Sequence, residues 1–260
     1  MTPEPLRSPL LPVLHGFFTR LGGVSTGPFA ALNCSLSGAD RPEAVAENRA
    51  RTVRSLGLPP GALVGLTQVH GTEVVRVREA WAPGQGPRAD GMVTDRAGLA
   101  LGIVTADCAP VLLADAEAGV VGAVHAGWRG AVAGAIEATI AAMAALGAAP
   151  ARLAAVVGPC IGQASYEVGS DLRDAVLAAD RQRGDGEGAR RLGPGRREDR
   201  WQFDLSGYCL ARLRAAGVGH AAALAADTAA DEARFFSHRR RTLGGGGPIG
   251  HQISIVALPG

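Results

Sequence analysis

The sequence ALGIVTADCAPVLLADAEAGVVGAVHAGWRG, at positions 100–130, contains three apolar runs separated by short polar or glycine-containing breaks. The runs cover residues 100–104, 111–114 and 120–124. Continuous apolar runs of this length are typical of β-strands that are buried on both faces. We therefore predict that the stretch forms consecutive strands at the centre of a layered domain.

The rest of the chain supplies further strands and several helices. Apolar runs predict strands at 73–77, 154–157 and 253–257, and helical patterns lie at 42–56, 131–146, 170–179 and 206–216. Because strands follow one another between separated helices, the pattern predicts an α+β fold. No internal repeat or persuasive domain boundary interrupts it, so we expect residues 1–260 to form a single domain.

One segment, residues 181–200, differs in composition from the rest of the chain. It is rich in Arg, Gly, Glu and Asp and has almost nothing to bury. Such a composition favours a flexible surface loop.

Composition and charge exclude several classes of protein. With 260 residues and a hydrophobic content of 47%, the chain can bury a core without disulfides, and a net charge of +2 does not indicate a nucleic-acid partner. No apolar stretch reaches the roughly 20 residues that cross a bilayer, and prolines interrupt the apolar run near the N-terminus, unlike a secretory signal. Four scattered cysteines fit a reducing compartment. We expect a soluble cytoplasmic protein with no membrane and no nucleic-acid partner.

Three short motifs each follow an apolar run with a residue that can bind a soft metal ion. QVHG (68–71), TADC (105–108) and HAGWRG (125–130) supply His70, Cys108 and His125. Two imidazoles and one thiolate suit zinc, and three protein ligands would leave the fourth tetrahedral position open for water or substrate. Buried histidines are often core residues, however, and this spacing matches no short zinc-finger pattern. The residues alone leave a metal site and a set of core residues as equal alternatives.

Arg129 and Gly130 open the predicted helix that follows His125. Free backbone N–H groups and a guanidinium beside the proposed metal suit an anion, and phosphate first. The alternative is an arginine that covers the helix start or pairs with a carboxylate.

The chain resembles the YfiH or laccase-domain family in a series of motifs that follow the family's order and span nearly the whole sequence. These motifs are TRLGGVS (19–25), ENR (47–49), QVHG (68–71), ADGMVT (89–94), TADC (105–108), HAGWRG (125–130), GPCIG (158–162), YEVG (166–169) and FFSHRR (235–240).

The resemblance implies a single-domain four-layer α/β/β/α fold with mixed sheets, and a zinc ion bound by His70, Cys108 and His125. It also implies a purine nucleoside phosphorylase that cleaves adenosine, inosine, guanosine and methylthioadenosine with inorganic phosphate, and that deaminates adenosine. Older descriptions of the family as polyphenol oxidases imply copper instead. A multicopper oxidase needs about ten histidines by the logic of imidazole-rich coordination, whereas this chain has 6. A single copper ion with Met92 as a weak axial ligand remains an alternative to zinc.

Several residues are expected to act on the substrate. Arg49 and Arg129 are candidates to bind phosphate, because planar guanidinium groups match its oxygens. Asp107 is a candidate general acid or base toward the purine, or equally a carboxylate that orients a zinc-bound imidazole. Gln68 is expected to hydrogen-bond the base or a sugar hydroxyl, and Ser25 to contact phosphate.

Other residues of the matching motifs have no clear chemical role. We interpret Asp90, Tyr166 and Glu167 as structural support, and Cys160 as a packed apolar residue. His251 stands where the family usually has an Arg, a change that could weaken phosphate binding or shift it to Arg239 and Arg240.

Two other kinds of protein remain open from the sequence. In the first, Cys108 is a nucleophile activated by His125, and the protein is a cysteine hydrolase or deamidase. In the second, the same residues bind zinc or copper without turnover.

Overall fold

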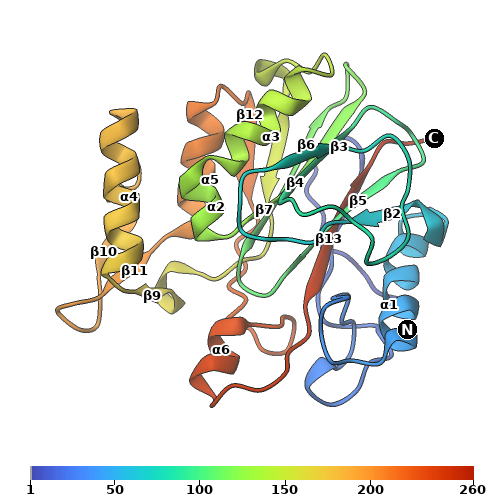
Figure 1. The fold of residues 1–260 in the computed structure, drawn as a ribbon, viewed down its shortest axis with the longest axis horizontal. Helices are drawn as coiled ribbons and strands as arrows, with labels where there is room; N and C mark the ends of the chain where they lie inside the picture. Colours follow the sequence, from blue (N-terminus) through green and yellow to red (C-terminus); the bar gives the residue numbers. More distant parts are fainter. Residues whose placement is uncertain (1) are drawn as a thin grey trace.

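The structure, a computed structural model, describes residues 2–260, with the helices and strands arranged as in Figure 1. The helices are α1 (Pro42–Ser55), α2 (Trp128–Ala133), α3 (Ala135–Ala144), α4 (Ser170–Arg183), α5 (Leu205–Ala215) and α6 (His238–Leu243). The strands are β1 (Leu14–Phe17), β2 (Leu63–Gly65), β3 (Val74–Arg76), β4 (Gly91–Thr94), β5 (Ala100–Thr105), β6 (Ala109–Asp115), β7 (Val120–Ala126), β8 (Ala154–Val157), β9 (Glu167–Val168), β10 (Leu192–Pro194), β11 (Trp201–Phe203), β12 (His220–Ala223) and β13 (Gln252–Ala257). Within residues 2–260, no helix has the length and apolar character that a bilayer-crossing segment requires.

Two main β-sheets lie at the centre of the molecule. The larger has the strand order β12-β8-β6-β7-β4-β3, and the smaller has the order β1-β13-β5-β2. Both are mixed, because β12–β8, β3–β4 and β2–β5 pair in parallel whereas the other neighbours are antiparallel. A third, small sheet has the order β10-β11-β9. The expected α+β fold with mixed sheets is confirmed.

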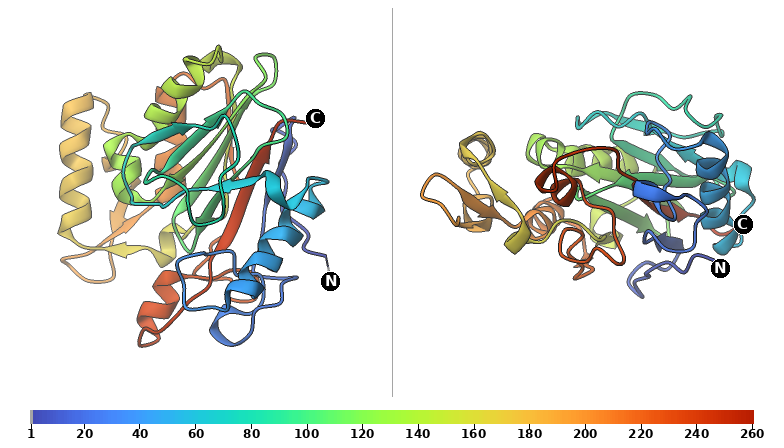
Figure 2. Two further views of the ribbon diagram at one scale, coloured as in Figure 1. Left: turned by 45° about the vertical axis from the view of Figure 1, so that its right-hand side comes forward. Right: turned by 90° about the horizontal axis from the view of Figure 1, so that it is seen from below.

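The helices and the two main sheets form four layers. Successive residues of a strand point to opposite faces of its sheet, so each sheet can pack against a different layer on each side. On β6, Val111 and Leu113 pack in the core beneath α2, α3, α4 and α5, whereas Leu112 packs in the core between the two sheets. On the other side of the smaller sheet, Ile253 of β13 packs in a third core with Val53 of α1. Figures 1 and 2 show this succession, with α3, α4 and α5 on one side of the paired sheets and α1 on the other.

One predicted helix is divided in the structure. The pattern over 131–146 predicts a single helix, but α2 ends at Ala133 and α3 begins at Ala135. Gly134 between them has a φ of 105°, a left-handed conformation that ends α2, and its N–H donates to the carbonyl of Gly130. The break leaves α2 as a separate short helix that begins at Trp128, just beyond the end of β7 at Ala126.

The segment 181–200 is more regular than the expected surface loop. Its first residues continue α4 to Arg183, and it contains β10, which pairs with β11. Hydrogen bonds and packing hold this segment in a regular conformation. The buried Asp180 carboxylate accepts the N–H groups of Gly188 and Ala189, and Leu192 packs against the core. The flexibility of this segment stays a prediction.

Candidate metal and substrate site

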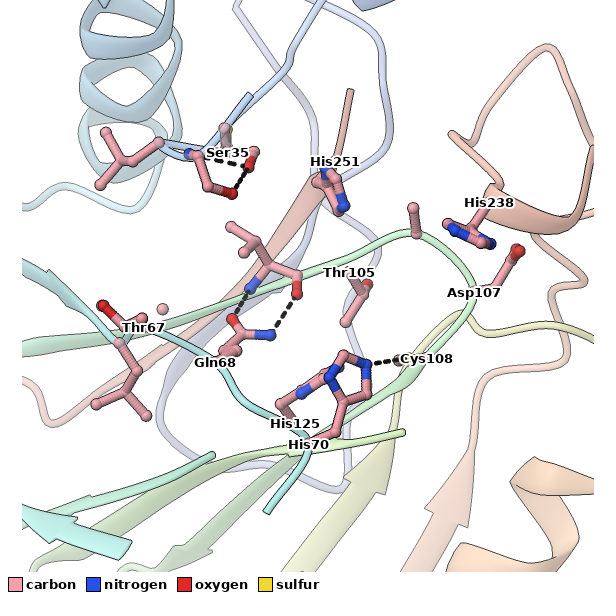
Figure 3. A pocket seen from close by; sticks show the side chains of 18 of the residues that line it. Ser35, Thr67, Gln68, His70, Thr105, Asp107, Cys108, His125, His238 and His251 are labelled. Carbon is pink, nitrogen blue, oxygen red and sulfur yellow. Dashed lines mark hydrogen bonds between the residues drawn. The ribbon is translucent and has the colours of Figure 1, made fainter. Parts of the chain in front are cut away.

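His70, Cys108 and His125 come together at one end of the two sheets. His125 lies near the end of β7, opposite Pro110 of β6, so Cys108 in the loop before β6 lies beside it. The possible ligand atoms of the three residues all lie within 4.8 Å of one another. The Cys108 Sγ is 3.8 Å from His70 Nε2, and the two imidazole rings are 4.7 Å apart between centroids (Figure 3). The sequence-predicted ligand set therefore forms one cluster that could hold a metal ion.

Gly127 makes this close approach feasible. A Cβ atom at position 127 would lie 2.8 Å from His70 Cδ2, which is closer than real Cβ atoms come to a neighbour, and 3.1 Å from Cys108 Sγ, which is a tight contact. The glycine leaves room for the imidazole and the thiol to converge. With two nitrogen donors and one sulfur donor, the cluster fits a zinc ion by its chemistry.

Asp90 fixes two of the three possible ligands. Its buried carboxylate lies 2.8 Å from His125 Nδ1 and accepts the backbone N–H groups of His70 at 2.9 Å and Gly71 at 2.6 Å. The contact with Nδ1 leaves Nε2 of His125 as the nitrogen available to a metal. His70 itself has a φ of 60°, an uncommon conformation for a non-glycine residue that these contacts to Asp90 hold in place.

The same cluster has a distinctive electrostatic state. Burial alone would raise the pKa of the Cys108 thiol, but the neighbouring His125 and His70 lower it to about 6. Burial alone would lower the pKa of His125, but Cys108 and Asp90 raise it. A thiolate beside imidazoles is the form of cysteine that binds metals and reacts as a nucleophile.

Asp107 contacts the C-terminal segment rather than an imidazole. Its Oδ1 accepts the hydroxyl of Thr228 at 2.7 Å, and its Oδ2 accepts the hydroxyl of Ser237 at 2.9 Å and the N–H of Arg239 at 2.6 Å. The orienting function that we considered for Asp107 is therefore performed by Asp90 in this structure. A role as general acid or base stays a prediction, and the observed contacts hold α6 against the end of the cavity where His238 lies.

The three possible ligands line a cavity of about 630 Å³. Gln68, Thr105 and His251 line the same cavity as the His70–His125 pair (Figure 3). Burial lowers the pKa of His251 to about 4, so its imidazole is neutral at pH 7. His251 thus places a neutral group where the resemblance implies a cationic Arg.

Three arginines that form no ion pair within residues 2–260 line the cavity: Arg239, which donates to the Glu167 carbonyl, and the two arginines expected to bind phosphate. Arg49 is only 7% exposed, and its Nη1 donates to the carbonyl of Cys34 at 3.1 Å. Arg129 is exposed, and its guanidinium lies 4.3 Å from the ring centroid of Trp128. Within residues 2–260 neither forms an ion pair with Asp or Glu, so the alternative in which Arg129 pairs with a carboxylate is not observed.

Two further residues expected to bind substrate are engaged elsewhere. Gln68 lines the cavity, but its amide nitrogen donates to the Val104 carbonyl at 2.8 Å and its amide oxygen accepts the Val104 N–H at 3.0 Å. Ser25 is absent from the cavity lining, and its hydroxyl donates to Asp40 at 2.6 Å and accepts from Asn48 at 2.8 Å. Their roles toward substrate stay predictions.

Sequence reasoning placed other residues only in part. His238, Arg239 and Tyr166 line the cavity, although no role was assigned to His238. Trp81 also lines it and was not anticipated, because an isolated tryptophan in a loop gives no local signal. Met92, considered as an axial copper ligand, is instead buried in the hydrophobic core between the two sheets and is absent from the cavity lining.

The chain is similar to known proteins over nearly its whole length. A family model described as multi-copper polyphenol oxidoreductase laccase matches residues 14–259. A protein of Deinococcus radiodurans named purine nucleoside phosphorylase is 44% identical over 254 residues, which cover 98% of this chain and 92% of that protein. Among solved structures, the Neisseria meningitidis protein NMB0706 is 34% identical with a TM-score of 0.86 and covers 100% of both chains. YlmD from Geobacillus stearothermophilus is 29% identical with a TM-score of 0.87, and the match covers 100% of this chain and 97% of that one.

Proposed function

Because the chain belongs to the family described as multi-copper polyphenol oxidoreductase laccase, which includes the YfiH proteins and relatives named purine nucleoside phosphorylase, we propose that it is a zinc-dependent purine nucleoside phosphorylase. Its proposed substrates are adenosine, inosine, guanosine and methylthioadenosine, which it cleaves with inorganic phosphate to free base and pentose 1-phosphate. Adenosine deamination is the proposed second activity, and the cytoplasm is the proposed location.

One observation carries the proposal: a cluster of His70, Cys108 and His125 lies in the wall of the same cavity as a buried, unpaired Arg49. The cluster suits a metal ion and the guanidinium suits a phosphate ion. A cavity of about 630 Å³ lies within the size range of small-molecule sites. The coincidence of a cation site and an anion site in one cavity supports a reaction between a nucleoside and phosphate.

Zinc is proposed over copper because of the residues that are present. Within residues 2–260 this is the only cluster of three or more His, Cys, Asp and Glu residues suited to a metal ion. The described residues therefore offer no ligand sets for the additional copper ions of a multicopper centre. Met92 lies in the core rather than at the cavity. A zinc ion bound here would supply Lewis acidity and lower the pKa of a water molecule to about 7.

The chain's own residues would bind and orient the reactants. His70, Cys108 and His125 would hold the metal, and Asp90 would keep the His125 ring in position. Arg49 and Arg129 would attract phosphate. Asp107 would hold His238 and Arg239 at the cavity, and it is the proposed acid or base if its contacts with Ser237 and Arg239 open during the reaction.

The test is incubation of untagged protein with adenosine, with and without phosphate, before and after zinc chelation. Adenine, inosine and hypoxanthine are separated chromatographically. The proposal requires adenine that depends on phosphate and disappears on chelation. Phosphate-independent inosine alone would make deamination the main activity, and the absence of every product would remove the proposal.

A cysteine hydrolase or deamidase is the second candidate, and the contact between Asp90 and His125 favours it. In such an enzyme the Cys108 thiol would be the nucleophile, the His125 imidazole the base and the Asp90 carboxylate the group that orients the imidazole. Tight zinc binding together with the absence of an acyl-enzyme on Cys108 by mass spectrometry would exclude this function.

A further inference from the structure

Arg49 creates a cationic site inside the cavity. The Arg49 side chain is more than nine-tenths buried and donates to the Cys34 carbonyl, and within residues 2–260 no carboxylate pairs with it. A buried charge without a partner is unfavourable, so an anion that enters the cavity would gain a strong interaction there.

The Arg49 guanidinium lies beside Gly65. Its Nη2 lies 3.3 Å from the point that a Cβ on Gly65 would occupy, and Gly65 of β2 pairs with Gly102 of β5. Thr105 is three residues further along β5, a distance of about 10 Å at the rise of a strand. Cys108 lies in the turn that follows Thr105, so the anion site lies beside the middle of β5 and the metal site lies at the end of that strand. We call these two parts of the cavity the anion end and the metal end.

Arg129 belongs to the metal end. It follows Gly127, whose position is in close contact with His70 and Cys108, and its guanidinium stacks on Trp128. A phosphate ion is shorter than the roughly 10 Å of β5 between Gly102, the partner of Gly65, and Thr105 at the metal end. A single phosphate therefore binds at one arginine and not at both.

The two proposed reactions also take place at opposite ends of a purine nucleoside. Deamination occurs at C6, on the six-membered ring, and it requires the water that a metal would activate. In phosphorolysis, a phosphate oxygen forms a bond to C1′ of the ribose while the bond from C1′ to N9 breaks, and the base leaves with the electron pair and takes up a proton from water. Phosphate must then lie beyond the ribose, away from the base.

We propose that a purine nucleoside binds with its six-membered ring at the metal end and its ribose toward Arg49, which holds the attacking phosphate. This orientation rests on the proposed function and specifies which end of the cavity performs which reaction. Gln68, Thr105 and His251 also line the cavity (Figure 3), and the proposal places them beside the bound nucleoside.

The test compares Arg49→Gln with Arg129→Gln in zinc-loaded protein supplied with adenosine and phosphate. In Arg49→Gln, the ratio of adenine to inosine formed should fall on the order of 100-fold, because a charged group that stabilises the reacting anion is lost. In Arg129→Gln, this ratio should change much less. Arg54→Gln is the matched control, because Arg54 lies on α1 as well but is exposed and does not line the cavity.

A binding measurement separates this orientation from the activity itself. Calorimetric titration of inorganic phosphate into zinc-chelated protein should show binding that Arg49→Gln weakens at least tenfold and Arg54→Gln leaves unchanged. Equal loss of adenine and inosine in a folded Arg49→Gln protein, or a selective loss of adenine in Arg129→Gln, would overturn the orientation alone. Wild-type protein that forms neither product would overturn the proposed function and this orientation together. Adenosine 5′-monophosphate is tested as a further substrate, because its own phosphate could bind to Arg49. If Arg49→Gln impaired only the deamination of this nucleotide, Arg49 would bind the phosphate of a nucleotide and not inorganic phosphate, and the proposed orientation would be wrong.

Discussion

Replacement of Asp90 by Asn should weaken zinc binding although Asp90 is not itself a proposed ligand. The carboxylate contacts His125 Nδ1 at 2.8 Å and accepts the N–H groups of His70 at 2.9 Å and Gly71 at 2.6 Å. An Asn side chain has one acceptor oxygen instead of two, and its NH₂ group would face at least one of these donors.

The size of the effect follows from these contacts. A buried donor that loses its acceptor costs about 1–3 kcal/mol, and every 1.4 kcal/mol corresponds to about a tenfold change in affinity. Residues that orient metal ligands typically contribute 10- to 100-fold in metal affinity. We therefore expect Asp90→Asn to raise the zinc dissociation constant about 10- to 100-fold.

The assay is competition for zinc against a chromophoric chelator, with circular dichroism to confirm that the protein is folded. Asp95→Asn serves as the control, because Asp95 lies just beyond the same strand, β4, and pairs with Arg76 at the surface. Zinc affinity in Asp90→Asn equal to that of wild type and Asp95→Asn would refute the reasoning about the cluster.

Three further changes test other parts of the account. Gly127→Ala should weaken zinc binding at least tenfold in the chelator competition, since the added Cβ would displace His70 or Cys108. Gly61→Ala is the control and should not weaken it, because a Cβ at position 61 meets no atom within 4 Å. Equal zinc affinities in the two variants would contradict this reasoning. Asp107→Asn should lower the rates of both reactions with zinc retained, because it loosens the contacts that hold α6 at the cavity, and steady-state kinetics with unchanged rates would show that those contacts do not matter. Gly134→Ala should lower the free energy of unfolding by about 1 kcal/mol or more, because alanine is strained at a φ of 105°; urea denaturation with an unchanged midpoint would count against this.

The central strands were predictable because their burial is recorded directly in the sequence. Both faces of β6 and β7 are covered, one by helices and the other by the second sheet, so their residues are apolar without alternation. The short strands β1 and β4 were not predicted, because a glycine and a polar residue interrupt the apolar pattern in each, with the sequences LHGF and GMVT, whereas the equally short β8 is the wholly apolar AAVV. The division between α2 and α3 was also missed, since a single glycine inside an alanine-rich run does not by itself indicate a left-handed conformation.

The candidate ligands were predictable for a local reason, whereas their support was not. His70, Cys108 and His125 each follow an apolar run, and strand ends from one sheet edge tend to converge. Asp90 reaches His125 only because Gly91 of β4 pairs with Val124 of β7, a long-range register that no local pattern specifies. For the same reason, the contacts that Asp107 makes with Thr228 and Ser237, more than 100 residues away, could not be anticipated.

The description of the family as multi-copper oxidases does not match the donor atoms present in this chain. Two imidazoles and one thiolate can hold one ion, and residues 2–260 contain no second cluster of this kind. Copper bound at the same three residues would show that the ligands have affinity for a soft ion, without a trinuclear centre to reduce oxygen.

The most direct test of the central claim is a titration of zinc into chelated protein while phosphate-dependent adenine formation from adenosine is followed. The account predicts that activity is absent without zinc, rises in proportion to added zinc and saturates at about one ion per chain, as expected for a single three-ligand site, with no recovery in Cys108→Ala. Full adenine formation by the zinc-free protein, or by zinc-free Cys108→Ala, would contradict it.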